Sequence, residues 1–425
     1  MTNVYESATL SNGIRVLTAP MPEVQSVSCL LMVAAGSRYE TRDTNGIAHF
    51  AEHMFFKGTE KRPRARDITT AIDRIGGEIN AFTAKEYTGY YVRCASEERS
   101  TAFDVLLDMI RHSTFAPDEI EREKGVIVEE MNMYFDTPRD FISGAYDQLL
   151  YGDQPLGWHV IGTKDTVRAA TRDTFLDYLG HWYKPERMIV GVGGRIEGDL
   201  IADLEGLLGG VEPGPTPAPD PAALADGAEP RVLLHTKQSD QAHLCLGVRS
   251  YPIVHPDRYV LQLITTILGG GMSSRLFTEV RERRGLAYYV FAVNNAYTDS
   301  GSFFAQAGVD IDRIDEAVTT IVTELRKIAD EPVPADELEK ARSSTKGRFV
   351  LQIESPHALL LFGLRRAVLE GGPTEPAEVL AGLDAVTAED VQRVAQDILG
   401  GRAGLHLALV GPFEDAERFE RLLVA

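Results

Sequence analysis

The strongest constraint on the fold of this chain is a proline-rich segment that divides its 425 residues into two nearly equal parts. Residues 209–230 read GGVEPGPTPAPDPAALADGAEP, a composition typical of a semi-rigid spacer rather than of a core. The parts on either side, 1–208 and 231–425, are each long enough to bury a hydrophobic core. We therefore predict two domains joined by a linker.

The two parts resemble each other at an offset of 218 residues. FAPDEIEREKG at 115–125 matches VPADELEKARS at 333–343, and the same offset places Met54 on Met272. Both parts read as strand, helix, strand and long helix in the same order, which is typical of layered α+β domains. The expected fold class is two homologous layered α+β domains, each with a mixed sheet and helices packed on one face.

The clearest local prediction in the first part is a helix over IAHFAEHMFF, placed between apolar strands at 26–36 and 88–95. Asp43, Thr44 and Asn45 precede this helix, and such side chains cap helix N-termini by accepting from free backbone N–H groups. We expect one of these three residues to fix where the helix begins.

The charge balance excludes some partners. Lys and Arg number 43 and Asp and Glu 63, so the formal net charge is −20, which repels nucleic acid. An acidic surface attracts basic peptides, polyamines or metal cations, but it also serves solubility alone. Composition leaves these alternatives open.

Three features predict a cytoplasmic protein. Cys29, Cys94 and Cys245 lie far apart in apolar runs, as buried free thiols of a reducing compartment do. The N-terminus has no signal-peptide pattern, and no apolar run reaches the ~18 residues that a membrane span needs.

The main chemical signal is His49-Phe50-Ala51-Glu52-His53. Residues four apart share one face of a helix, so His49 and His53 can bind one metal ion. A single histidine on an apolar helix is more often a satisfied core residue. Two of them, with Glu52 between, instead form the inverted zinc motif, in which a carboxylate beside the ion acts as a base.

A catalytic zinc site needs a third protein ligand. Glu123 and Glu130 lie seven residues apart in EREKGVIVEEM and share a helical face, whereas Glu129 points about 100° away from Glu130. We assign Glu130 as the third ligand and Glu123 as a carboxylate that orients one histidine.

This constellation resembles the pitrilysin or insulinase family of inverted-motif zinc peptidases. His49, Glu52, His53 and Glu130 match its motif, with 76 residues between His53 and Glu130. The EKGVIVEEM context is most similar to the β-subunit of the mitochondrial processing peptidase and its half-length bacterial relatives. Further stretches that resemble the family are GGEINAFTAKEYTGYY, HVIGTKDTV and GGGMSSRLFTEVRERRGLAYYV.

The resemblance implies one Zn²⁺ per chain, bound by His49, His53 and Glu130, with Glu52 as the general base. It implies a processing-peptidase-like metalloendopeptidase that hydrolyses extended peptides inside a closed chamber. The alternative is a non-catalytic structural or peptide-binding subunit of the same fold in a hetero-oligomer.

The resemblance also implies residues that hold the substrate. Arg281 and Tyr288 have the seven-residue spacing of the family's arginine–tyrosine pair and would donate to a peptide carbonyl. Asn80, Ala81, Phe82 and Thr83 would belong to the edge strand onto which substrates add, with Asn80, Ala81 and Phe82 binding the substrate.

The second half is expected to be catalytically silent. The repeat offset aligns His53 with Gly271 and Glu130 with Arg348, neither of which binds metal. The whole chain would form half of a clamshell. We predict a homodimer, because the chain carries both the metal motif and the Arg281–Tyr288 pair, and a heterodimer with an inactive homologue is the alternative.

Overall fold

The structure, a computed structural model, describes residues 3–223, 231–400 and 404–424. These residues form two compact units, and neither unit is one continuous stretch of chain. The first unit comprises Met1–Met131, His159–Asp220 and Val350–Pro376. The second unit comprises Asn132–Trp158, Pro221–Phe349 and Ala377–Ala425.

The first unit is built on a six-stranded mixed sheet in the order β1-β2-β6-β3-β5-β4. β2 and β6 are parallel, and the other neighbours are antiparallel. The apolar run at 26–36 forms the central β3, which is buried because helices cover both of its faces. The strands are β1 (Glu6–Thr9), β2 (Arg15–Pro20), β3 (Ser26–Val33), β4 (Glu78–Thr83), β5 (Thr88–Ala95) and β6 (Met188–Gly194).

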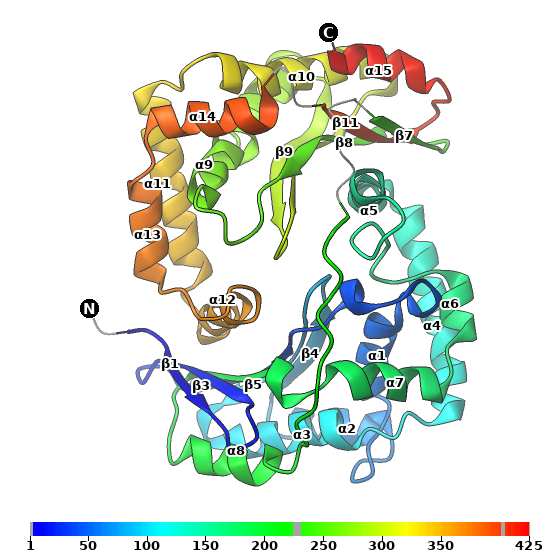
Figure 1. The fold of residues 1–425 in the computed structure, drawn as a ribbon, viewed down its shortest axis with the longest axis vertical. Helices are drawn as coiled ribbons and strands as arrows, with labels where there is room; N and C mark the ends of the chain where they lie inside the picture. The colour runs from blue at the N-terminus through cyan, green and yellow to red at the C-terminus, as the bar shows by residue number, and fades with distance from the viewer. Residues whose placement is uncertain (1–2, 224–230, 401–403, 425) are drawn as a thin grey trace. The chain divides into compact units, whose positions relative to one another are not determined.

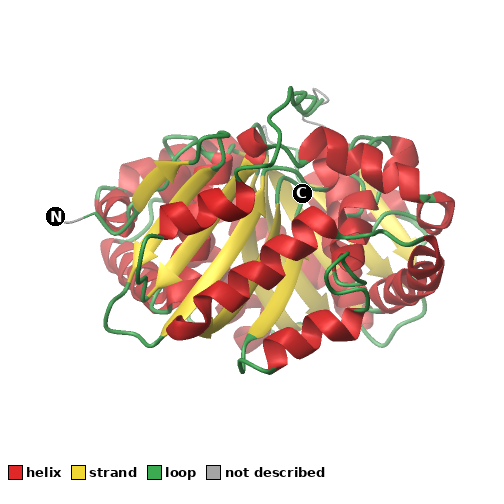
Figure 2. Ribbon diagram, turned by 90° about the horizontal axis from the view of Figure 1, so that it is seen from below, coloured by secondary structure: helices red, strands yellow, loops and turns green. Residues whose placement is uncertain are grey.

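Helices lie over the strands of each unit, as Figure 2 shows. In chain order, the helices of the first half are α1 (Ile47–Phe55), α2 (Ala65–Asp73), α3 (Arg99–His112), α4 (Pro117–Asp136), α5 (Pro138–Tyr151), α6 (Lys164–Ala169), α7 (Arg172–Trp182) and α8 (Leu200–Leu208).

The second unit contains a five-stranded sheet in the order β7-β11-β8-β10-β9. Its strands are β7 (Arg231–Thr236), β8 (Ala242–Ser250), β9 (Ala287–Ala296), β10 (Gly301–Val309) and β11 (His406–Gly411). The helices of the second half are α9 (Arg258–Gly269), the π-helix η5 (Phe277–Arg283), α10 (Ile314–Asp330), α11 (Ala335–Gln352), α12 (Pro356–Leu369), α13 (Pro376–Asp384), α14 (Ala388–Leu399) and α15 (Ala416–Val424).

The predicted α+β fold class and the internal repeat are confirmed, but the expectation that helices pack on only one face of each sheet is wrong. Without β1, the first sheet has the strand order and strand directions of the second. The helices α5 and α12 begin and end 218 residues apart. The offset is not uniform, because α1 and α9 begin at 47 and 258, only 211 apart. Gly271 therefore lies beyond the end of α9 and is not the positional counterpart of His53.

One helix of each half packs on the sheet of the other half's unit, which the sequence pattern did not indicate. In the first unit, α12 lies beside the sheet (Figure 1), and its Leu360 and Leu364 share a buried cluster with Leu30 and Met32 of β3. In the second unit, side chains of α5 pack against β8, β10 and β11. Each sheet thus has helices on both faces.

The proline-rich segment has no helix or strand between residues 211 and 223, and residues 224–230 lie outside the described ranges. Two arginines of the first unit bind backbone carbonyls of this segment. Arg187 donates to the carbonyl of Pro217 at 2.5 Å, and Arg38 donates to the carbonyl of Asp220 at 3.2 Å. The three cysteines are buried and unpaired, as the sequence predicts.

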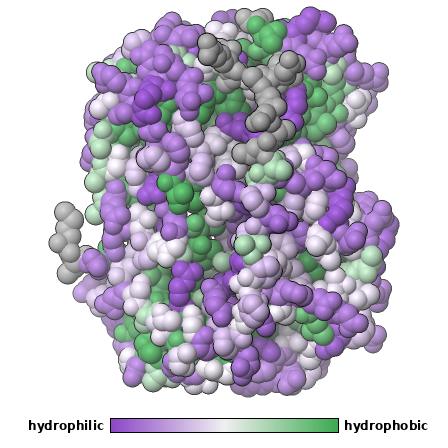
Figure 3. Space-filling model, in the orientation of Figure 1, coloured by the Kyte–Doolittle hydropathy of each residue, from purple (hydrophilic) through white to green (hydrophobic). Residues whose placement is uncertain are grey.

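Hydrophilic side chains cover most of the face in Figure 3, in keeping with the large number of charged residues. No helix in the described ranges combines the length and the apolar character that crossing a membrane would require.

A close helix–sheet contact generates a test of the α12 packing. A Cβ atom at Gly193 of β6 would lie 2.7 Å from the Pro356 carbonyl oxygen and 3.0 Å from Leu360 Cβ. Gly193→Ala should therefore lower the free energy of unfolding by about 1–3 kcal/mol through overpacking, measured by urea titration.

The matched control is Gly180→Ala in α7, where the added methyl meets nothing within 4 Å and should raise stability by about 0.5–1 kcal/mol. Wild-type stability in Gly193→Ala would contradict the close approach of α12.

Candidate metal centre

The helix α1 carries the histidine motif, and a distant carboxylate fixes its start. The N-cap position is Gly46, with φ of +94°, and no side chain caps from there. The expectation that Asp43, Thr44 or Asn45 caps the helix is wrong, because residues 42–44 form a 3₁₀ turn in which Thr44 bonds back to Thr41.

Glu40 performs the capping instead. Its carboxylate accepts from the backbone N–H of Gly46 and of Ala48, each at 2.8 Å, and from the side-chain amide of Asn45 at 2.9 Å. Burial raises the pKa of Glu40 to about 8, and the three hydrogen bonds oppose that rise. Glu40 thus fixes the beginning of α1 by side-chain contacts rather than by the local turn.

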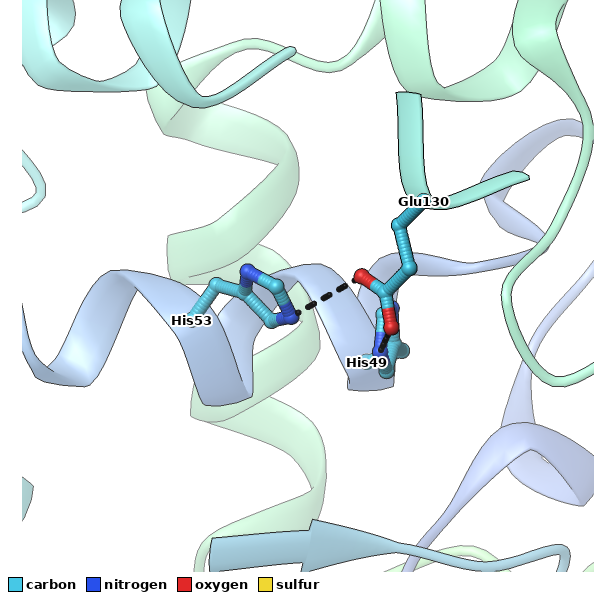
Figure 4. Close-up of side chains that lie close together, drawn as sticks. All are labelled: His49, His53 and Glu130. Carbon is cyan, nitrogen blue, oxygen red and sulfur yellow. Dashed lines mark ion pairs between the residues drawn. The ribbon is translucent and has the colours of Figure 1, made fainter. Parts of the chain in front are cut away.

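His49 and His53 of α1 converge with Glu130 of α4 (Figure 4). One ligand atom from each residue lies within 4.8 Å of the other two. The Nε2 atoms of His49 and His53 lie 3.7 Å and 3.5 Å from the two carboxylate oxygens of Glu130. Burial, and then the neighbouring His53, lower the pKa of His49 to about 3, so His49 is neutral and able to bind a metal.

The donor set fits zinc. Zn²⁺ binds nitrogen and carboxylate oxygen at ~2.1 Å, so two tetrahedral ligand atoms should lie about 3.4 Å apart. The two imidazole nitrogens approach different oxygens of Glu130, at 3.7 Å and 3.5 Å, and a set with one ligand atom from each residue spans no more than 4.8 Å, so the three side chains are close enough to bind one ion. Glu130 and not Glu129 takes part, as the helical spacing predicts, and no fourth His, Cys, Asp or Glu in the described ranges joins the group.

Glu123, on the same helical face as Glu130, contacts His53. Its Oε1 lies 2.9 Å from His53 Nδ1, and its Oε2 accepts from Lys57 Nζ at 2.6 Å. Burial raises the pKa of Glu123, but the hydrogen bonds from His53 and Lys57 outweigh burial and lower it overall. The ionised carboxylate leaves Nε2 of His53 as the nitrogen that faces Glu130.

Glu52 lies beside the cluster without joining it. Its Oε2 accepts a 2.5 Å hydrogen bond from Thr83 Oγ1 at the end of β4. Burial raises the pKa of the Glu52 carboxyl, while the bond from Thr83 lowers it. A partly buried carboxylate next to an ion site is suited to proton transfer.

Asn80, Ala81 and Phe82 lie in β4, which is an edge strand of the first sheet. Its inner edge pairs with β5, with Phe82 opposite Gly89. The outer edge of β4 pairs with no other described strand. This is the arrangement that strand addition requires.

Arg281 and Tyr288 lie together in the second unit. Arg281 is on the π-helix η5, and its guanidinium carbon is 5.6 Å from the centre of the Tyr288 ring at the start of β9. The Tyr288 side chain is 72% exposed, so its hydroxyl is free to meet a ligand.

Three residues near the centre were missed by the sequence reasoning. Lys57 follows His53 by one helical turn, and that spacing was a usable signal. Thr83 belongs to the predicted substrate strand, but only the packing of β4 against α1 brings its hydroxyl to Glu52. Glu40 had no sequence signal, because its role depends on the 3₁₀ turn between it and α1.

Fold and site together define a class: a two-unit α+β protein with an inverted histidine motif of the metallopeptidase kind. The family model described as "Insulinase (Peptidase family M16)" matches residues 15–164, and "Peptidase M16 inactive domain" matches residues 169–345. The chain belongs to the insulinase family of peptidases, family M16.

Relatives and solved structures agree with this membership. "Uncharacterized zinc protease YmxG" of Bacillus subtilis is 36% identical over 95% of this chain and 97% of its own length. An "Uncharacterized zinc protease" of Rickettsia bellii is 33% identical, with 96% and 98% covered. The crystal structure of a protease from Helicobacter pylori matches with a TM-score of 0.88 at 22% identity, covering 97% of this chain and 100% of that one.

The Glu123 contacts generate a test of metal retention. Glu123→Gln removes the charged acceptor shared by His53 and Lys57, and loss of such an orienting group typically weakens metal binding ~10–100-fold. We expect a rise of that size in the zinc dissociation constant, measured by competition with a chromophoric chelator.

Glu121→Gln is the matched control, because Glu121 is on the same helix but exposed and paired with Lys124. Equal zinc affinity in the two variants would show that Glu123 does not orient His53.

Proposed function

We propose that this chain is a zinc metalloendopeptidase that hydrolyses extended peptides, with one Zn²⁺ per chain held by His49, His53 and Glu130. The observation that carries the proposal is the convergence of these three side chains beside a carboxylate, Glu52, that is not one of them. Three protein donors leave one position open, as in catalytic rather than structural zinc sites. The relatives named zinc proteases support the same assignment.

The chemistry divides between the ion and the protein. When bound, Zn²⁺ polarises the scissile carbonyl and makes water acidic enough to attack at neutral pH. Glu52 takes the proton from the attacking water and returns it to the leaving amine, acting first as general base and then as general acid. Glu123 keeps His53 in the tautomer and orientation that the site needs.

Substrate binding follows from strand addition. An extended peptide pairs with the outer edge of β4 at Asn80, Ala81 and Phe82, so backbone hydrogen bonds give affinity with little sequence selectivity. Arg281 and Tyr288 donate to the peptide carbonyl as negative charge develops there. The net charge of −20 favours basic peptides.

The proposal is tested by zinc analysis and digestion of a mixed peptide library, with and without chelator, read by mass spectrometry. Glu52→Gln should retain zinc and lose cleavage by at least ~10²–10⁴-fold, because glutamine cannot accept the proton. Zinc should restore cleavage to chelated wild-type protein but not to the variant.

Two results would contradict this assignment. Turnover by Glu52→Gln at the wild-type rate would remove Glu52 as the base. Zinc binding without cleavage of any peptide by the wild-type protein would favour the non-catalytic subunit.

We further propose a closed homodimer in which Arg281 and Tyr288 of one copy serve the zinc site of its partner. Glu52→Gln and the double variant Arg281→Ala/Tyr288→Phe should each be inactive alone. Mixing them after subunit exchange should restore roughly a quarter of wild-type activity, because about half of the dimers are mixed and each has one complete site.

Light scattering at micromolar concentration gives the independent measurement of mass. A fully active monomer, or mixed variants without any recovered activity, would contradict action between subunits.

A further inference from the structure

Thr83 links the edge strand to the carboxylate beside the metal centre. It is the last residue of β4, and its hydroxyl donates to Glu52 Oε2 at 2.5 Å. Successive side chains of a strand point to opposite faces, so Thr83 faces α1 together with Ala81, while Phe82 packs into the cluster around α12 on the other face.

The bond to Thr83 is the only side-chain hydrogen bond of Glu52 within the described ranges. It engages one of the two carboxylate oxygens, and the second oxygen, Oε1, keeps its full capacity to accept a proton. A glutamate has three rotatable side-chain bonds, so without this contact the carboxylate would sample several orientations. Proton transfer requires one of them.

The residue type suits that task. Thr83 is branched at Cβ, which restricts its first side-chain torsion. Its backbone is held in the β4–β5 ladder opposite Thr88. The donor that reaches Glu52 is therefore fixed to the sheet rather than to the helix that carries the histidines.

We propose that Thr83 is a positioning residue that holds the Glu52 carboxylate with Oε1 free for the attacking water. The inference rests on the proposed peptidase function. It assigns to the end of β4 a second role, because the strand that receives the peptide also orients the base. Thr83 acts through Glu52 and does not itself touch the reacting atoms.

The test compares Thr83→Val, which removes the hydroxyl at constant shape, with Thr83→Ser, which retains it. Loss of a hydrogen bond to a charged group corresponds to a ~10–100-fold change in a rate or equilibrium constant. Thr83→Val should lower kcat by that factor with KM within about twofold and zinc content unchanged, since the backbone edge that binds the peptide remains. Thr83→Ser should recover most of kcat.

Thr88→Val is the matched control. Thr88 lies opposite Thr83, and its buried hydroxyl donates to the Ala35 carbonyl at 2.9 Å, away from Glu52. Its removal should lower stability and leave kcat unchanged. Equal loss of kcat in the Thr83 and Thr88 variants would show that the Thr83 hydroxyl only supports the sheet, and would overturn the proposal.

A second readout does not depend on activity. Crystal structures of zinc-free wild-type and Thr83→Val proteins should show an ordered Glu52 carboxylate in the first and a displaced or multiply oriented one in the second. An unchanged carboxylate, or a wild-type kcat in Thr83→Val, overturns the inference. Absence of zinc-dependent cleavage by wild-type protein would instead overturn the peptidase assignment, and the crystallographic comparison would still decide the role of Thr83.

Discussion

The approach of α1 to α4 at His53 is the contact on which the metal centre depends. The Nε2 atom of His53 faces Glu130, and its Nδ1 atom contacts Glu123. Both glutamates are on α4. Lys57, just past the end of α1, forms an ion pair with Glu123. The same side chains also hold the two helices together.

The helix that bears both histidines is held at each end by polar side chains. Glu40, which is 5% exposed, anchors its start through two backbone N–H groups, and Lys57 lies just past its last residue. Burying a carboxylate is unfavourable unless donors compensate, which is why Glu40 has three. These contacts fix the position of α1 along its own axis, as a preorganised site requires.

Local periodicity explains how much the sequence revealed. The pairs His49–His53 and Glu123–Glu130 each repeat along one helix, so spacing alone placed each pair on one face. Glu40 is brought to the start of α1 by a turn, and Thr83 is brought to Glu52 by the sheet. No residue spacing in the sequence predicts either contact. Likewise, the packing of α12 on the first sheet joins residues more than 300 positions apart, which local spacing does not encode.

The internal repeat allows the helix pair of the first unit, which carries the candidate metal ligands, to be compared with the corresponding pair of the second unit. In the second unit, α9 and α11 are the counterparts of α1 and α4, and a 2.9 Å hydrogen bond between Thr266 and Thr345 joins them. Two hydroxyls, together with a hydrogen bond from Arg348 to the Gly270 carbonyl, thus join the helix pair where the first unit uses imidazoles and carboxylates. Since the pair packs in either case, the polar set of the first unit is not needed to build the fold. Half-buried charges carry a desolvation cost, so this polar set is not explained by stability alone.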